Sequence, residues 1–166
     1  ILCLVRHGQY VLDTENRRAG LLTPVGKKQA HLTGKRLAEL PFTKMFHSDL
    51  PRAKETAEII SAYLPHVPKY STHLLREVTM PVGKEHRYLF GAQKLDFAGS
   101  RTQTQALMKR FFKPVRGKEP RYELLVAHGN LIRYLTRMAV GDKPERWLQL
   151  GTMNCGITIL SIGKTT

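Results

Sequence analysis

The chain contains 166 residues, 42% of them hydrophobic and 24% charged, and its formal net charge is +14. We predict a single catalytic domain over residues 1–166, because this length supports one substantial core and is short for two. The composition is that of a globular protein, no stretch approaches the roughly 18 apolar residues of a membrane span, and two cysteines exclude a disulfide framework.

The ends and the charge of the chain bear on its setting. No signal or transit peptide is visible, and the sequence opens inside a predicted strand at Ile1 and stops just after another. We therefore expect an excised domain whose anchor or targeting segment lies outside it. The basic excess favours an anionic partner, which is nucleic acid, an acidic membrane surface or a phosphorylated substrate. The basic residues form no run of five or more, which argues against a basic tail.

Hydrophobic periodicity and turn residues predict an alternation of strands and helices. The expected elements are, in order, a strand Leu2–Val5, a polar loop Gln9–Leu22, a helix from Thr23-Pro24 to about Leu40, a strand Lys44–His47, a helix from Pro51 to about Leu64, an extended piece Leu74–Glu77, an irregular insertion Val78–Ser100, a helix around Gln103–Phe112, a strand Leu124–Ala127, a helix from Leu131 to about Val140 and a strand Gly156–Ile162.

Three helices carry an apolar stripe that is expected to face the core. Its members are Ala30, Thr33 or Gly34, Leu37 and Leu40 in the first, Ala53, Ala57, Ile60 and Leu64 in the second, and Leu131, Leu135, Met138 and Ala139 in the last. The alternation of core strands with helices implies a mainly parallel sheet covered on both faces. The predicted fold class is α/β, a three-layer α/β/α sandwich.

Two predicted strands that are far apart in the chain end in the same dipeptide, His7-Gly8 and His128-Gly129. The carboxyl ends of parallel strands lie along one edge of a sheet, which is where open α/β sheets place their ligand sites. A single histidine at a strand end is more often a satisfied structural residue. Two at equivalent positions, one of them beside Arg6, favour a shared site in which His7 is a nucleophile toward phosphate.

Two arginines and a carboxylate are further candidates. Arg6, at the end of a core strand, suits a bidentate phosphate contact. Arg52, near the start of a predicted helix, either points at the site, where the helix N-terminus also attracts anions, or is a solvated helix residue. Glu77 either protonates a leaving oxygen or forms a salt bridge to a site arginine, and its spacing leaves both readings open.

The sequence lacks the patterns of several other kinds of site. We expect no metal and no cofactor, because the remaining histidines show neither helical pairing nor a Cys/His ligand spacing. The chain has no Gly-rich Walker loop and no RNA-recognition pattern with interleaved aromatics, so a nucleic-acid partner is not expected either. The histidines concerned are His31, His47, His66, His73 and His86.

Five segments resemble, in order, the motifs of the histidine phosphatase superfamily, the phosphoglycerate-mutase-like phosphatases. They are Val5-Arg6-His7-Gly8, Leu22-Thr23-Pro24-x-Gly26-x-x-Gln29-Ala30, Ser48-x-x-x-Arg52-Ala53-x-Glu55-Thr56-Ala57, Leu75-Arg76-Glu77 and Val126-Ala127-His128-Gly129-Asn130. Within this family the chain looks closest to the mitochondrial branch that dephosphorylates protein serine, threonine and histidine. The segments that look like that branch are Arg6-His7-Gly8-Gln9-Tyr10, His128 to Tyr134, Trp147-Leu148 and Asn154 to Thr158.

The true mutases differ from this chain in two respects. They carry a Trp-Asn pair where Leu12-Asp13 stands here, and they have a long insertion that holds the sugar acid. Mutase activity is therefore not expected.

The resemblance implies a metal-independent reaction. His7 attacks the phosphoryl group and becomes phosphohistidine, while Glu77 gives a proton to the leaving alkoxide and later activates water. Arginine and histidine side chains, with a backbone N–H, hold the phosphoryl oxygens. The implied assignments are catalytic His7, Glu77 and His128, phosphate-binding Arg6, Arg52, His128 and Gly129, and substrate-rim Gln9 and Asn130.

The resulting prediction is a phosphomonoesterase that forms a phosphohistidine intermediate and acts on protein phosphoserine, phosphothreonine or phosphohistidine. Two alternatives stay open: a small-molecule phosphatase for a sugar or another metabolite, and a catalytically weak module that binds phosphoproteins or nucleic acid through its basic surface. We expect a homo-oligomer, a mitochondrial location by resemblance and a cytoplasmic one otherwise, with membrane association only through a segment outside this chain.

Overall fold

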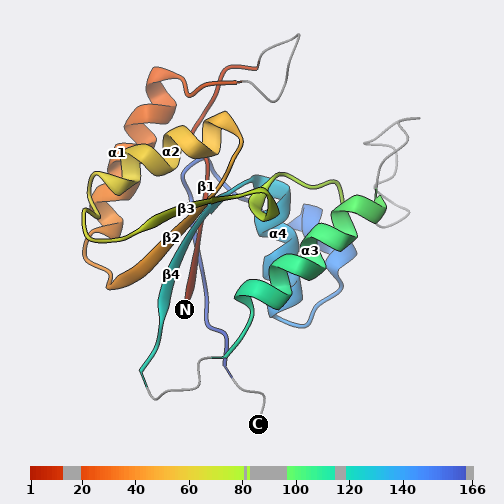
Figure 1. Ribbon diagram of the computed structural model, residues 1–166. Coiled ribbons are helices and arrows are strands. Elements are labelled where there is room, and N and C mark those ends of the chain that lie inside the picture. Colours follow the sequence, from red (N-terminus) through yellow and green to blue (C-terminus); the bar gives the residue numbers. More distant parts are fainter. Residues whose placement is uncertain (13–19, 81, 83–96, 115–118, 164–166) are drawn as a thin grey trace.

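The protein is an α/β structure in which one twisted sheet separates two pairs of helices (Figure 1). The computed structural model describes residues 1–12, 20–80, 82, 97–114 and 119–163. The strands are β1 (Leu2–Arg6), β2 (Phe42–Ser48), β3 (Lys69–Thr72), β4 (Tyr122–Ala127) and β5 (Ile157–Leu160). The helices are α1 (Pro24–Leu37), α2 (Pro51–Ser61), α3 (Phe97–Phe111) and α4 (Gly129–Ala139), with the 3₁₀ turns η1 (His73–Leu75) and η3 (Pro144–Gln149).

The sheet is mostly parallel, with the strand order β3-β2-β4-β1-β5. Strands β1, β2, β3 and β4 run in one direction, and β5 pairs antiparallel with β1 at one edge. The register pairs Arg6 with Ala127, so the residues that follow them, His7 and His128, leave neighbouring strands at the same level. The strand pairing therefore brings the two His-Gly segments to the same edge of the sheet, as expected.

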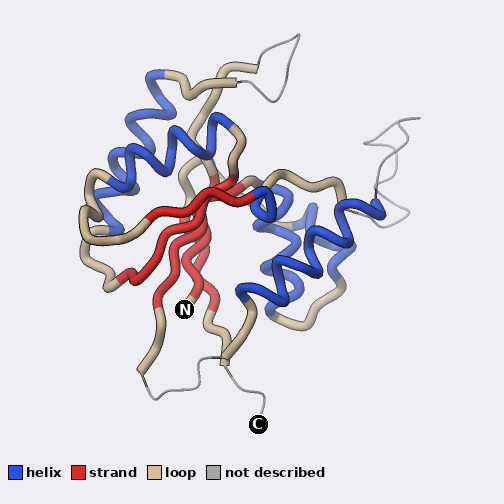
Figure 2. The backbone as a smooth tube through the Cα atoms, viewed as in Figure 1, coloured by secondary structure: helices blue, strands red, loops and turns tan. Residues whose placement is uncertain are grey.

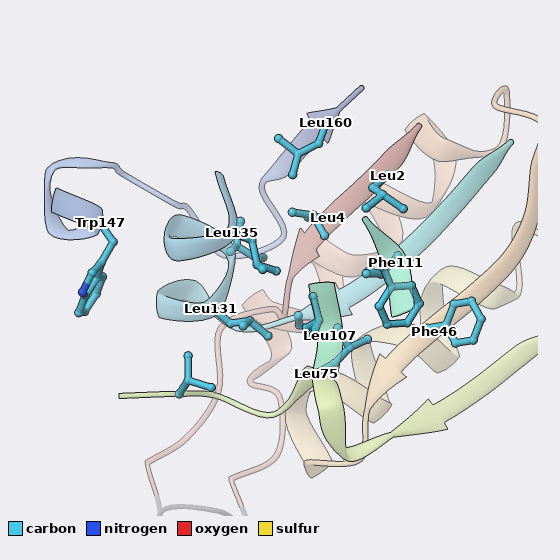
Figure 3. Packing of buried hydrophobic residues seen from close by; sticks show 14 of the residues in the cluster. Leu2, Leu4, Phe46, Leu75, Leu107, Phe111, Leu131, Leu135, Trp147 and Leu160 are labelled. Carbon is cyan, nitrogen blue, oxygen red and sulfur yellow. The ribbon is translucent and has the colours of Figure 1, made fainter. Parts of the chain in front are cut away.

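Each face of the sheet has its own hydrophobic core, which makes three layers in all (Figure 2). Alternate residues of a strand point to opposite faces, so Leu4 of β1 faces α3 and α4 while Val5 faces α1 and α2. The core on the α3 and α4 side also takes in Trp147 from η3 (Figure 3). Within the described residues, no helix combines the length and apolarity needed to cross a bilayer.

The loop after β1 lies directly on the first turn of α1. A Cβ atom on Gly8 would lie 2.6 Å from the carbonyl oxygen of Gly26, and one on Gly26 would lie 1.9 Å from that of Gln9. The Thr23 N–H donates to the same Gln9 carbonyl at 3.0 Å, and the Thr23 hydroxyl oxygen caps α1. Backbone therefore packs on backbone here, and glycine is required for the close approach.

Replacing Gly26 with alanine is expected to lower the free energy of unfolding by about 1–3 kcal/mol, because the backbone beside it must move to admit a methyl group. Urea titration of the variant measures this loss. Gly151→Ala is the matched control, since a Cβ on Gly151 meets nothing within 4 Å. Equal midpoints for the two variants would contradict the close packing.

The strand and turn after α2 differ from the sequence prediction. Edge strand β3 was not expected, because Lys69–Thr72 has no apolar alternation and is defined by its pairing with β2. The piece predicted to be extended from Leu74 begins instead as the 3₁₀ turn η1, in which the Thr72 hydroxyl oxygen accepts the N–H of Leu74. Extended backbone resumes at Arg76.

Several helix ends also differ from the predicted ones. Helix α1 ends at Leu37 and leaves Leu40 half-buried, because Pro41 disfavours helical geometry in the residue before it. Ala139 was expected to face the core but is exposed, as the buried turns of α4 end at Leu135. Helix α3 begins at Phe97, inside the predicted insertion, and residues 83–96 of that insertion lie outside the described residues.

Candidate active site

The carboxyl edge of the sheet brings together two buried imidazoles. The rings of His7, after β1, and His128, after β4, have centroids 5.0 Å apart. Their exposed fractions are 3% and 0%. The sequence placed both residues at equivalent strand ends, and the strand register brings them into one site.

His7 is held with one ring nitrogen unprotonated, the state in which it can act as a base or nucleophile. Its Nδ1 lies 2.8 Å from the carbonyl oxygen of Gly8. Because a carbonyl only accepts, Nδ1 carries the proton and Nε2 keeps its lone pair. The Arg52 Nε–H donates to this Nε2 over 3.2 Å.

Burial is the largest cause that lowers the pKa of His7, to about 4, and the nearby charges of Arg52 and Arg6 lower it further. The hydrogen bond to the Gly8 carbonyl acts in the opposite direction. His7 is therefore neutral at physiological pH, which is the state in which an imidazole is nucleophilic.

The neighbours of this ring present nitrogens that have no hydrogen-bond partner among the described residues. Among the described residues, Arg6 Nε, Arg52 Nη1 and His128 Nδ1 are buried and have no hydrogen-bond partner. Arg6 is fixed from its other side, since its Nη1 donates to the Thr152 carbonyl at 2.6 Å. Buried N–H groups without acceptors are costly, and two guanidinium groups that both act on His7 suit an oxyanion beside it. The arrangement can bind a phosphoryl group.

Gly129 opens α4 and lies against the guanidinium of Arg6. A Cβ atom at this position would lie 3.2 Å from Arg6 Nε and 3.3 Å from the hydroxyl of Thr152. Glycine therefore lets Arg6 sit close to the first turn of α4, where backbone N–H groups attract anions.

Glu77 places its carboxylate on the N-terminus of α4. It accepts the backbone N–H groups of Leu131 at 3.1 Å, Asn130 at 3.3 Å and Val78 at 3.2 Å. Burial raises the pKa of Glu77 above its usual value, and the three amide hydrogen bonds oppose that effect. A carboxyl with a raised pKa is suited to give and take a proton.

Glu77 and Arg52 both line a cavity of about 810 Å³. The other lining residues are Tyr10, Leu12, Leu50, Arg76, Thr79, Gly99, Ser100 and Gln103. Arg76 donates from Nε and Nη2 to the two carboxylate oxygens of Asp49, at 2.7 and 2.6 Å. Arg52 is thus the basic lining residue that is not held in an ion pair among the described residues.

The two predicted rim residues are not among the described residues that line this cavity. The side-chain oxygen of Gln9 accepts the hydroxyl of Thr23 at 2.7 Å, so it strengthens the cap of α1. Asn130 contributes its backbone N–H, which contacts Glu77.

Three residues that stand in the quoted motif segments, but to which the sequence analysis gave no role, support the site. The ring of Tyr10 packs edge to face on His7 at 5.1 Å and lies 4.8 Å below the guanidinium carbon of Arg52. The Thr56 hydroxyl accepts the N–H of Gly8, and the Asn154 side chain donates to the carbonyl of His7, both at 3.0 Å. Tyr10 follows the His-Gly segment directly, but the other two contacts depend on tertiary packing alone.

In the described part of the chain, no group of three or more His, Cys, Asp or Glu side chains is placed to hold a metal ion. The donor set around His7 is guanidinium and imidazole nitrogen. Guanidinium groups and an imidazole N–H donate hydrogen bonds to anions.

The buried His7 predicts that the protein loses stability in acid. Its pKa falls from 6.5 to about 4 on folding, so between these values the unfolded chain binds a proton that the folded chain does not. Its contribution is therefore complete above pH 6.5 and is lost as the pH falls toward 4, by about 3 kcal/mol in all. Urea unfolding at pH 7 and pH 4 measures the loss, and His7→Asn is expected to reduce it by that amount. An equal loss in the variant would contradict the assignment.

Comparison with known proteins agrees with the motif order. Residues 2–166 match the histidine phosphatase superfamily (branch 1). The mitochondrial serine/threonine-protein phosphatase PGAM5 of Xenopus laevis is 39% identical over 163 residues, which cover 96% of this chain and 59% of that protein. The human protein of the same name is 37% identical over 163 residues, covering 96% of this chain and 56% of that protein. The chain thus spans less than two thirds of the length of these curated relatives.

Solved structures give the same fold. Phosphoglycerate mutase from Plasmodium falciparum has a TM-score of 0.64 at 31% identity, covering 94% of this chain and 78% of that chain. YhfR of Bacillus stearothermophilus has a TM-score of 0.69 at 23% identity, over 94% and 88% of the two chains, and supports the fold alone. On the motif order, the fold and the match over nearly its whole length, this chain belongs to the histidine phosphatase superfamily.

Proposed function

We propose that this chain is a phosphomonoesterase that forms a phosphohistidine at His7 and acts on phosphorylated protein side chains. The observation that carries the proposal is the neutral Nε2 of His7, which lies among buried guanidinium nitrogens without partners. Such a site can bind an anion and also contains a nucleophile. A protein that only binds phosphate has no need of the nucleophile.

In the first step, the Nε2 lone pair of His7 attacks phosphorus and the ester P–O bond breaks. The phosphate oxygens accept hydrogen bonds from the N–H groups of Arg6 and Arg52. The hydrogen bond from Arg52 to His7 Nε2 therefore breaks as the substrate enters. Protonated Glu77 gives its proton to the leaving oxygen, and the alcohol departs. Phosphoryl transfer depends mainly on positioning and charge stabilisation, which these side chains supply.

In the second step, water attacks the phosphohistidine and the P–N bond breaks. The Glu77 carboxylate takes a proton from that water, orthophosphate leaves, and His7 returns to its neutral state. Glu77 thus ends the cycle with the proton that it began with.

The cavity supports a protein substrate over a small phosphorylated acid. Leu12, Leu50 and Tyr10 contribute apolar surface to its lining, and the charge of Arg76 is already neutralised by Asp49. A phosphorylated sugar acid would need a further free cation for its carboxylate, and the described part of the lining offers only Arg52 without an ion-pair partner. A phosphorylated serine or threonine in a peptide needs one phosphate site and a neutral surface beside it. The curated relatives are protein phosphatases named as mitochondrial, and we extend both features to this chain as part of the proposal.

The test compares kcat/KM for phosphoserine and phosphothreonine peptides with that for 3-phosphoglycerate. We expect the peptides to be favoured by at least about 10-fold, the difference made by one unmatched carboxylate. Acid and alkali quenches during turnover are expected to trap a phosphoenzyme that is labile in acid and stable in alkali. A preference for 3-phosphoglycerate would contradict the protein substrate, and a missing phosphoenzyme would contradict the mechanism.

A further inference from the structure

The imidazole of His128 contacts a buried hydroxyl on the side away from its unpartnered nitrogen. Its Nε2 lies 2.9 Å from the Oγ of Ser48, and its Nδ1 is buried without a partner among the described residues. Ser48 is the last residue of β2 and is fully buried. We propose that Ser48 is a positioning residue that fixes the proton of His128 on Nδ1, which makes this imidazole a hydrogen-bond donor toward the phosphoryl group. The inference rests on the phosphatase function proposed above.

The hydrogen-bond inventory of Ser48 supports this direction. The backbone N–H of Leu50 donates to Ser48 Oγ at 3.3 Å. An N–H cannot accept, so the hydroxyl proton of Ser48 has to point elsewhere. In the described part of the chain, the other recorded partner of this oxygen is His128 Nε2. The hydroxyl therefore donates to Nε2, which leaves the ring proton on Nδ1.

The tautomer matters because His128 is neutral. Burial lowers its pKa well below 6.5, and the charges of Arg52 and Arg6 act in the same direction. A histidine cation would donate from both nitrogens, but the neutral ring donates from one and accepts at the other.

The two tautomers have opposite effects on an anion. With the proton on Nδ1, the ring offers a third donor beside the guanidinium groups of Arg6 and Arg52. With the proton on Nε2, a lone pair would face the phosphoryl oxygens and repel them. A donor already aimed at the developing charge contributes to catalysis because it needs no rearrangement.

The fold supplies the contact through the register of two strands. His47 of β2 pairs with Val126 of β4, so the next residue of β2, Ser48, ends close to the segment that carries His128. The Nδ1 of His47 also lies 2.9 Å from the Ser48 carbonyl, which restrains the backbone here. Ser48 is thus placed to act on His128 without touching substrate.

The first test reads the tautomer directly by ¹⁵N NMR of the ring nitrogens at pH 7.5, on the chain without substrate. We expect His128 to carry its proton on Nδ1 in the wild type, and to shift toward a mixture of tautomers in Ser48→Ala. A wild-type ring with its proton on Nε2 would overturn the inference. Because this readout needs no turnover, it stands even if the proposed phosphatase activity fails.

The second test is a double-mutant cycle in kcat/KM with para-nitrophenyl phosphate. Ser48→Ala is expected to lower this value by about 10- to 100-fold, the usual effect of losing a group that orients an active-site histidine. In a His128→Ala background, the same change is expected to cost less than about 2-fold, because Ser48 then has no ring to orient. Equal losses in both backgrounds would show a merely structural role and overturn the proposal.

Two controls separate orientation from damage to the fold. Ser48→Thr keeps the hydroxyl and is expected to restore both the Nδ1 tautomer and most of the activity. Inorganic phosphate serves as a ligand independent of turnover, and its Kd is expected to rise by about 10-fold in Ser48→Ala. An unchanged Kd together with an unchanged tautomer would contradict the inference.

Discussion

Replacing His7 with alanine is expected to abolish the hydrolysis of para-nitrophenyl phosphate, with kcat falling by about 10⁴-fold or more. The reason is chemical, since the variant has no atom that can accept phosphorus. The surrounding arginines still bind phosphate, so the variant is expected to bind inorganic phosphate while it forms no phosphoenzyme. Steady-state rates and acid-labile labelling with radioactive substrate measure the two effects separately.

His31→Ala is the matched control for this experiment. His31 is exposed on α1, and its Nδ1 lies 3.0 Å from the hydroxyl oxygen of Tyr63. It is not part of the candidate site, so its loss is expected to leave kcat unchanged. Removing His7 also removes a buried ring, so thermal unfolding of both variants is compared with that of the wild type. A folded His7→Ala variant that keeps its rate within 10-fold, or that still forms the labile phosphoenzyme, would rule out His7 as the nucleophile.

The sequence was most informative where a strand is buried on both faces. Strands β1 and β4 contain the uninterrupted apolar runs Leu2–Val5 and Leu124–Ala127, and such runs are characteristic of central parallel strands. Their polar ends therefore marked the sheet edge at which His7 and His128 meet. The starts of helices α1 and α2 could also be predicted, because Pro24 and Pro51 mark their first turns.

The sequence was least informative where pairing or distant packing determines the structure. Edge strand β3 has no periodicity of its own and exists through its register with β2. The contact between Ser48 and His128 joins residues that are 80 positions apart. No local pattern encodes such a distance, and it becomes visible only when β2 is placed beside β4.

Spacing left two readings of Glu77 open, and the contacts of its carboxylate bear on both. The alternative to a proton-transfer role was a salt bridge with an arginine of the site. In the structure, its carboxylate accepts the backbone N–H groups of Asn130 and Leu131 at the start of α4 and that of the adjacent Val78. The neighbouring Arg76 pairs with Asp49. The carboxyl is therefore held in place by hydrogen bonds that leave it able to exchange a proton at the cavity.

Replacing Glu77 with glutamine is expected to separate substrates by their leaving groups. A phosphoserine peptide releases an alkoxide that needs a proton as the P–O bond breaks, so kcat/KM for it is expected to fall by about 10²- to 10⁴-fold. Para-nitrophenolate is a stable anion that leaves without that proton. For para-nitrophenyl phosphate the loss is expected to stay within about 10-fold, and both values come from the same protein preparation.

The pH dependence provides an independent check on the same residue. Burial raises the pKa of Glu77, so the protonated acid persists to a higher pH than it would in solvent. Wild-type kcat/KM for the phosphopeptide is expected to decline as the pH rises through that pKa, and the Glu77→Gln profile is expected to lack this decline.

Glu39→Gln is the matched control for Glu77→Gln, since Glu39 is exposed and pairs with Arg36 outside the cavity. It is expected to leave both rates unchanged. A glutamine at 77 retains one carbonyl oxygen for the amides of α4, but its NH₂ group opposes them, so some loss of stability is expected. A folding defect would lower kcat/KM for both substrates by the same factor, whereas loss of a proton donor lowers kcat/KM mainly for the phosphopeptide. Equal losses of kcat/KM for the two substrates would therefore show that Glu77 only caps α4 and donates no proton.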